Sequence, residues 1–370
     1  MTKVVTILLC SCYLIHADNT PDLCTSDIVD LLKIKPSDTN PGVPVPNITV
    51  GGFEYNGDAE HFVIGNSISA TKDLALVYIP GTTDRPALSS CLLKSVAEHA
   101  QYPTIGLSYK YLSSGDKFRN GKCALLGSVE EQVNCLTEQH EDAINGGTFG
   151  STHFKDDGSH FWDEILPHDS ITARLGFLFK YLDDSFPNSG WELFYSNGSE
   201  FPVPNWKKLI IMGHSQGAGH AAYLAQSNKL RGAVMLSGPQ DECIDCPDGT
   251  TFWIDSPYMT DKYTAFASGS EPFYDLMREN WDRITATGAT SWEPGHVADV
   301  GYGFKKNFDV CTSPLVSYVM HAATSTCGGK AHCSTAIDDS VPFLEKYDGE
   351  KQYLYDIAVW PLVARKVKGC

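Results

Sequence analysis

Six short apolar runs, spaced along the chain, constrain the fold of this sequence more than any other feature. They cover residues 61–64, 74–80, 104–109, 208–213, 232–238 and 263–268. Each run is nearly continuously apolar, which is typical of strands that helices cover on both faces. Segments with helical periodicity lie between the runs, at 87–99, 169–183 and 216–226. The alternation predicts an α/β fold with a mostly parallel central sheet and helices on both faces.

The start of the chain has the pattern of a secretory signal peptide. Lys3 precedes an apolar run over residues 4–15, and the small residue Ala17 follows it. The run is too short to span a bilayer, and we expect no transmembrane segment. We predict a signal peptide over 1–17, an irregular lead-in over 18–50 with a short helical piece around 28–34, and one domain over 51–370. The protein is therefore expected to be secreted or to reside in the secretory lumen.

The cysteine count agrees with export. The chain has twelve cysteines, two of them inside the predicted signal peptide, so an even number remains. In an exported chain this suggests several disulfides, whose pairing the sequence does not determine. Cys123 and Cys135 are one candidate pair. Cys243 and Cys246 are another, and a structural disulfide is favoured over thiol exchange because no helix start lies beside them to activate a thiol.

Charge and composition exclude several kinds of partner. The formal net charge is −17, and no run is rich in Lys or Arg, so nucleic acid and anionic membranes are not expected partners. Asn47 and Asn197 each begin an acceptor sequence for N-glycosylation. His153 and His160 lie in an acidic stretch, but their spacing matches no zinc or calcium signature. No metal or other cofactor is expected.

The stretch KKLIIMGHSQGAGHAAYL, residues 207–224, joins an apolar run to a helical segment through a serine between glycines. A strand that ends at Gly213 and a helix that starts near Gln216 force a sharp turn, with Ser215 strained at its apex. Gly213 and Gly217 leave room for this turn. It would present the hydroxyl at the carboxyl edge of the sheet, where open α/β folds bind ligands. This context favours a nucleophile over an ordinary loop serine.

Gly213-His214-Ser215-Gln216-Gly217, after the LIIM strand, resembles the nucleophile elbow of the α/β-hydrolase superfamily. The order of strands and helices extends this resemblance over most of residues 60–360. The resemblance implies a serine nucleophile that needs a histidine base and an orienting carboxylate. It also implies that the acid and then the histidine follow Ser215 along the chain.

In that order, His332 is the expected base and His296 the runner-up. His332 lies in the loop CGGKAHCSTA, after a segment, YVMHAATST, that we expect to be the last strand. Cys327 and Cys333 flank this loop, and we hypothesise that they pair and hold His332 in place. His214 and His220, although close to Ser215 in sequence, are not expected to act as the base.

Glu271, in the turn GSEPF after the apolar run at 263–268, is the expected acid. The resemblance would more commonly place an aspartate there, and Asp275 is the competitor. The oxyanion of an acyl-transfer reaction needs backbone N–H donors. By the same resemblance one donor comes from Gln216, directly after the nucleophile, and the other from the turn Gly81-Thr82-Thr83. Pro80-Gly81 replaces the His-Gly pair of the family there, so Thr82 is the expected residue and Thr83 the alternative.

The resemblance implies a secreted serine esterase or lipase that acts on a small-molecule or lipid-like ester. An inactive hydrolase-fold binding protein is one alternative, and a thiol oxidoreductase that uses Cys243 and Cys246 is another. The long insertion over 113–168 is expected to be either a cap over the site or a decorating subdomain. The oligomeric state and the acyl and alcohol groups of the substrate do not follow from the sequence.

Overall fold

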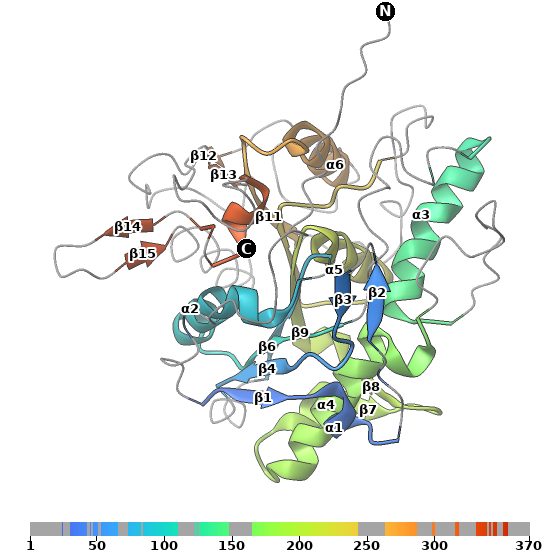
Figure 1. Ribbon diagram of the computed structural model, residues 1–370, viewed down its shortest axis with the longest axis vertical. Helices are drawn as coiled ribbons and strands as arrows, with labels where there is room; N and C mark the ends of the chain where they lie inside the picture. The colour runs from blue at the N-terminus through green and yellow to red at the C-terminus, as the bar shows by residue number, and fades with distance from the viewer. Residues whose placement is uncertain are drawn as a thin grey trace, which may run out of the picture.

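Figure 1 shows the computed structural model of the chain as a ribbon. The structure describes residues 24, 30–42, 45, 47–50, 53–65, 73–82, 84–109, 123, 126–147, 165–242, 263–286, 298–299, 315–317, 331–338, 340–341, 343–345 and 351–353. The predicted signal peptide and YVMHAATST lie outside these residues. So do the residues Cys243, Cys246, His296, Cys327, His153 and His160.

A sheet of nine strands forms the centre of the described structure. Its strands in spatial order are β1 (Leu32–Ile34), β4 (His61–Ile64), β6 (Thr104–Gly106), β5 (Ala75–Ile79), β9 (Leu209–His214), β10 (Gly232–Leu236), β11 (Tyr263–Ser268), β13 (Leu315–Ser317) and β12 (Ala298–Asp299). Only the β1–β4 and β4–β6 pairs are antiparallel. β9 is the central strand, between β5 and β10, so its carboxyl end opens at the middle of one sheet edge.

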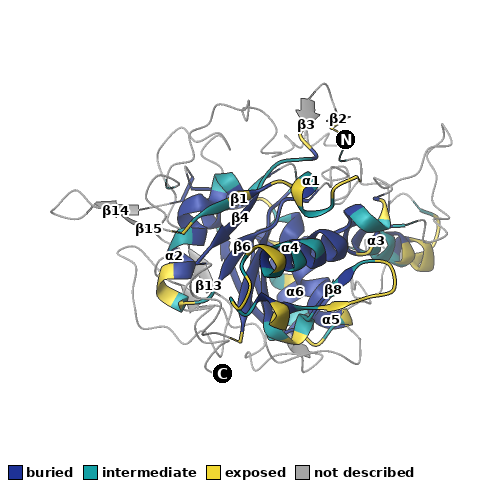
Figure 2. Cartoon of the chain, turned by 90° about the horizontal axis from the view of Figure 1, so that it is seen from below, coloured by how far each residue is buried: buried dark blue, intermediate teal, exposed yellow. Residues whose placement is uncertain are grey.

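The side chains of the central strands alternate between two apolar layers. In β5, Val77 and Ile79 face one layer, whereas Leu76 and Tyr78 face the other. The first layer contains residues of α4 (Ile171–Ser185), α5 (Gln216–Ser227) and α6 (Tyr274–Ala286). The second contains residues of α2 (Ser90–Ala100). Figure 2 shows the buried strands between these helices, so both faces of the sheet are covered.

Smaller elements surround this core. α1 (Pro36–Thr39) is a single turn, and α3 (Val129–Ile144) packs against α5. Three hairpins are β2 (Ile48–Val50) with β3 (Phe53–Tyr55), β7 (Tyr195–Asn197) with β8 (Pro202–Pro204), and β14 (Phe343–Glu345) with β15 (Lys351–Tyr353). Short 3₁₀ helices span Pro86–Ser89, Pro167–Asp169, Trp191–Phe194, Trp206–Lys208 and Ala331–Thr335. Among the described residues, the helices are too short or too polar to cross a membrane.

The structure confirms the mostly parallel α/β architecture and differs from the sequence analysis in two places. All six predicted runs form strands, and the three predicted helices correspond to α2, α4 and α5. Residues 32–34, placed in a helical piece of the lead-in, instead form the edge strand β1. α3 lies in the insertion over 113–168, where no helix was predicted. Its start carries a capping box, in which Ser128 accepts from Glu131 N and donates to the Glu131 carboxylate.

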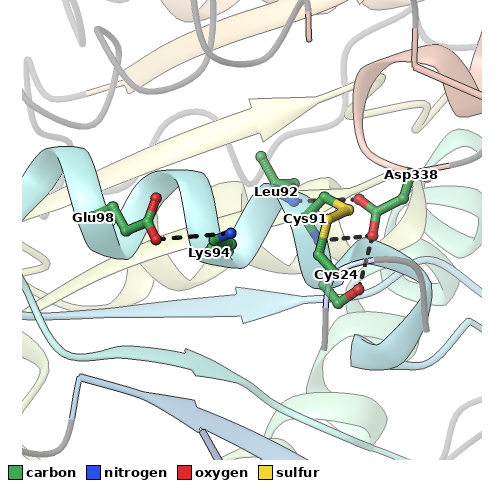
Figure 3. Close-up of a disulfide and its surroundings, with 7 residues drawn as sticks. Cys24, Cys91, Leu92, Lys94, Glu98 and Asp338 are labelled. Carbon is green, nitrogen blue, oxygen red and sulfur yellow. Dashed lines mark hydrogen bonds and ion pairs between the residues drawn. A yellow bond between two sulfur atoms is a disulfide. The ribbon is translucent and has the colours of Figure 1, made fainter. Parts of the chain in front are cut away.

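Two disulfides tie peripheral segments to this core. Cys123 pairs with Cys135, as predicted, and closes the start of α3. Cys24 pairs with Cys91 on the first turn of α2, which attaches the lead-in to the domain (Figure 3). Cys333 is also disulfide-bonded. Because Cys327 lies outside the described residues, its predicted pairing with Cys333 stays a prediction.

Candidate active site

Ser215 occupies the sharp turn between β9 and α5. Its backbone has φ 55° and ψ −120°, a conformation that costs a non-glycine residue energy and is concentrated at functional sites. A Cβ on Gly213 would lie 2.0 Å from Gly217 O, and one on Gly217 would lie 2.1 Å from Ile79 O. Larger residues at either position would therefore break the turn. The partly exposed serine stands at the carboxyl end of the central strand, as predicted.

The structure brings together the three residues that were expected to act with one another. His332 Nε2 lies 2.8 Å from Ser215 Oγ, and His332 Nδ1 lies 2.6 Å from Glu271 Oε2. The three residues are far apart in sequence, and they meet because β9, β11 and the 3₁₀ helix Ala331–Thr335 converge at one sheet edge. A neutral imidazole in this position donates from Nδ1 to the carboxylate and accepts from the serine hydroxyl.

Glu271 is held in a buried environment with several donors. It is 4% exposed, and its Oε1 accepts from Ser237 Oγ at 3.1 Å and from Ser268 N at 3.2 Å. Thr335 Oγ1 lies 2.8 Å from Ser237 Oγ and supplies a proton to it when Ser237 donates to Glu271. These bonds compensate for the burial of a carboxylate. Asp275, the competing acid, is exposed on the first turn of α6.

The segment that carries His332 is anchored to α2. Asp338 accepts from the N–H groups of Cys91 at 2.7 Å and Leu92 at 3.2 Å, and from Ser90 Oγ at 3.1 Å (Figure 3). Asp338 N also donates to Leu88 O at 2.9 Å. This carboxylate satisfies N–H groups at the start of α2 that would otherwise lack helical acceptors. The cap fixes the histidine segment beside the Cys24–Cys91 disulfide.

His214, the residue before Ser215, contacts the backbone of His332. It is fully buried, and its Nε2 donates to the main-chain oxygen of His332 at 3.0 Å. The two imidazole rings lie 5.1 Å apart, centroid to centroid. On the other side of the ring, Nδ1 faces Asp84 Oδ2 at 3.6 Å. His214 and Asp84 therefore form a second imidazole–carboxylate pair, next to Ser215 and His332.

The two residues expected to bind an oxyanion are neighbours. Thr82 Oγ1 donates to Gln216 Oε1 at 2.7 Å, which joins the turn after β5 to the first residue of α5. The absence of a side chain at Gly81 allows the turn after β5 to pack closely against Ser215. A Cβ at Gly81 would lie 2.9 Å from Asp84 Oδ2 and 3.2 Å from Ser215 Cβ. The N–H of Gln216 lies at the positive end of α5. Thr83 is outside the described residues.

Sequence reasoning missed several supporting residues of the site, among them His214 and Ser237. His214 was assigned no role, and Ser237 was not singled out, although it has a φ of 51° and is fully buried. Both lie at strand ends beside Ser215, and position alone could have drawn attention to them. Their contacts join segments distant in sequence, so no local pattern identifies their partners. Among the described residues, no group of three or more His, Cys, Asp and Glu could hold a metal ion.

A small cavity of about 20 Å³ opens beside Ser215. Its walls come from α3, the first turns of α5 and residues 240–242, which follow β10. The described part of the 113–168 insertion therefore lies beside Ser215 through α3. Whether the whole insertion covers the site stays a prediction.

A scan of protein-family models and a search of curated protein sequences gave no match. Solved structures with a similar fold include an arylesterase, at 12% identity and TM-score 0.36 over 83% of this chain and 81% of that one. Another is a thermostable esterase from Pseudomonas putida ECU1011, at 10% identity and TM-score 0.38 over 87% and 81%. A third is a hyperthermophilic esterase from the archaeon Pyrobaculum calidifontis, at 11% identity and TM-score 0.36 over 80% of this chain and 76% of that one.

The order of the strands and the turn at Ser215 identify the fold of this chain. β9 lies at the centre of a mostly parallel sheet and leads through a strained turn at Ser215 into α5. Glu271 and His332 follow in that order along the chain, each after a later strand. The strand order and this turn give the chain an α/β-hydrolase fold.

Proposed function

We propose that the protein is a secreted serine hydrolase that cleaves a carboxylic ester through an acyl-enzyme on Ser215. The observation that carries this proposal is the chain of hydrogen-bond distances from Ser215 Oγ through His332 to Glu271. A serine hydroxyl is a poor nucleophile until a base removes its proton. Here the base is within reach, and a buried carboxylate orients it.

In the proposed reaction, Ser215 Oγ attacks the ester carbonyl carbon while His332 Nε2 takes its proton. The tetrahedral intermediate collapses, and the alcohol leaves with that proton. Water then attacks the acyl-serine as His332 again accepts a proton. Collapse of the second intermediate releases the acid and returns the proton to Ser215. Glu271 stabilises the imidazolium in both halves of the reaction and holds the tautomer that accepts from the serine.

Main-chain donors at Gln216 and Thr82 would stabilise the oxyanion. Gln216 is the first residue of α5, where the helix dipole favours negative charge. The hydrogen bond between the side chains of Thr82 and Gln216 holds the two backbone segments together. Donors that are fixed in this way need no rearrangement when negative charge develops on the oxygen. They therefore lower the barrier of the reaction.

Secretion is supported by the amino-terminal pattern and by the disulfides. Such bonds persist in oxidising compartments and are rare in the cytosol. Asn197 is exposed on β7 and Asn47 is exposed before β2, so both proposed glycosylation sites are accessible. Expression in a eukaryotic secretory host tests this part. The protein should appear in the medium without residues 1–17 and should lose mass on treatment with an endoglycosidase, and an intracellular, uncleaved product would contradict it.

A fluorophosphonate probe tests the enzyme proposal. The serine oxygen displaces fluoride from phosphorus, its proton passes to the base, and the protein is labelled. Wild type should be labelled and should hydrolyse nitrophenyl esters of short acids, whereas Ser215→Ala should do neither. Ser196→Ala, on the exposed surface of β7, is the matched control and should behave like wild type. An unlabelled wild type would instead favour a hydrolase-fold binding protein, and ester hydrolysis that survives Ser215→Ala would exclude the mechanism.

A further inference from the structure

The cavity beside Ser215 has the size of one small chemical group. Its volume is about 20 Å³, and about 10–15 Å³ on this measure holds one water molecule. A long saturated chain does not fit in it. Because it adjoins Ser215, it lies where a substituent of the bound substrate would be placed.

Gly219, on the first turns of α5, keeps this space open. A Cβ at this position would lie 3.2 Å from His140 Cε1 and 3.6 Å from Asp241 Oδ1. A methyl group would therefore occupy the gap between α5 and the opposite wall. The cavity depends on glycine at 219, which gives a simple way to narrow it.

The opposite wall is held in place by a buried polar cluster. His140 Nε2 lies 2.8 Å from Asp241 Oδ2, and His140 Nδ1 lies 3.0 Å from His220 Nδ1. The His140 ring also stacks on Tyr223 at 4.9 Å. With its two nitrogens and one ring face engaged, His140 has little freedom to turn. The wall is therefore a preorganised polar surface.

Gln139, next to His140 on α3, contributes a side-chain amide to the cavity wall. It is 7% exposed, and in the part of the chain that the structure describes its side-chain amide makes no hydrogen bond. A hydroxyl group can accept from the amide nitrogen and donate to the amide oxygen.

We propose that this cavity is the subsite for a hydroxyl group on the acyl part of the ester, and that Gln139 determines this specificity. The inference rests on the proposed esterase function. The acyl part is chosen because it stays bound to Ser215 through both steps, whereas the alcohol must leave after the first. Asp241 and Glu242 also line the cavity and disfavour an anionic acyl substituent.

Two nitrophenyl esters that differ only by hydroxyl in place of methyl provide the test. They are the 2-hydroxypropanoate, used as both enantiomers, and the 2-methylpropanoate. Each kcat/KM is divided by the rate of hydroxide hydrolysis of the same ester, because the hydroxyl also activates the carbonyl. Wild type should prefer one hydroxy ester by about 10-fold or more, since a site built to bind a hydroxyl rejects the apolar analogue. A corrected ratio near one would overturn the proposal.

Gln139→Leu should reduce this preference to about 2-fold or less, because the amide is lost. Asn134→Leu, on the exposed face of α3, is the matched control and should keep the wild-type ratio. Gly219→Ala fills the cavity from the other side and should reduce the ratio as well, so the test stands if Gln139→Leu does not fold. A preference that persists in both cavity variants would show that the hydroxyl binds elsewhere.

The two proposals fail in different ways. If no ester is hydrolysed in a Ser215-dependent manner, the esterase function is wrong. If both esters are hydrolysed and the methyl ester is equal or better, the function stands and the hydroxyl subsite is wrong.

Discussion

The imidazole of His214 donates a hydrogen bond to the main-chain oxygen of His332, with 3.0 Å between Nε2 and that oxygen. The residue that precedes the nucleophile in sequence therefore holds the backbone of the residue expected to activate it. Because His214 contacts neither Ser215 Oγ nor Glu271 in the proposed reaction, it is a positioning residue. Its effect should appear in turnover and not in binding.

His214→Leu should lower kcat by about 10- to 100-fold with little change in KM, because a small displacement of a catalytic base has effects of that size. His214→Gln, whose amide can reach the same oxygen, should recover part of the loss. Steady-state kinetics on a short-chain ester checks this. His99→Leu, on the exposed side of α2, is the control and should match wild type. A change confined to KM would contradict the positioning role.

Glu271 and Asp275 should be distinguishable by removing their charges. Glu271→Gln keeps the shape but should hold His332 in the wrong tautomer, and kcat should fall by about 1,000-fold or more. Asp275→Asn should remain within about 2-fold of wild type, because its side chain is exposed on α6. Turnover of both variants, with circular dichroism to verify folding, decides between them. The reverse order of effects would make Asp275 the acid.

His61, on β4, should make the fold sensitive to acid. Complete burial, with Arg174 nearby, holds the pKa of His61 well below the ordinary 6.5. Its Nδ1 accepts from Ser108 N at 3.0 Å, and its Nε2 has no hydrogen-bond partner among the described residues. As pH falls below 6.5, the unfolded chain binds a proton at His61 that the folded chain does not bind. The free energy of unfolding should therefore fall, by up to about 1.4 kcal/mol per pH unit.

His61→Asn removes the titrating group and keeps an acceptor for Ser108. Urea unfolding between pH 8 and about pH 5 should show a shallower loss of stability than in wild type. The exposed-site variant His99→Asn should keep the wild-type slope. Parallel curves for wild type and His61→Asn would mean that His61 titrates alike in the folded and unfolded chains.

The Cys24–Cys91 disulfide should contribute more stability than Cys123–Cys135. Their sequence separations are 67 and 12 residues, and the entropy removed from the unfolded chain grows with the closed loop. The chain-entropy model gives about 4 and about 3 kcal/mol respectively. Paired Cys→Ala variants, compared by urea unfolding, check this order. Equal losses, or a larger loss at Cys123–Cys135, would contradict the entropic account.

Much of the fold could be read from local patterns. All six apolar runs form strands because a strand buried on both faces requires a short, continuous apolar segment. α3 was missed because most of its residues are polar and its first turn is acidic, although the Ser128–Glu131 pattern of a capping box marks its start. Residues 32–34 were misassigned because a short apolar segment has no reliable period. There, pairing with β4 decides the structure.

By itself, the sequence determined the nucleophile turn and the chain order of its partners. The turn at Ser215 requires glycine at positions 213 and 217 for steric reasons. Because these positions adjoin Ser215 in the chain, the requirement is visible in the sequence. The tertiary structure alone decided that Glu271 is buried and Asp275 exposed, and that His214 supports His332. It also decided that Gln139 faces the cavity beside Ser215. These relationships depend on how distant segments pack, and packing is set by the whole sheet and its helices.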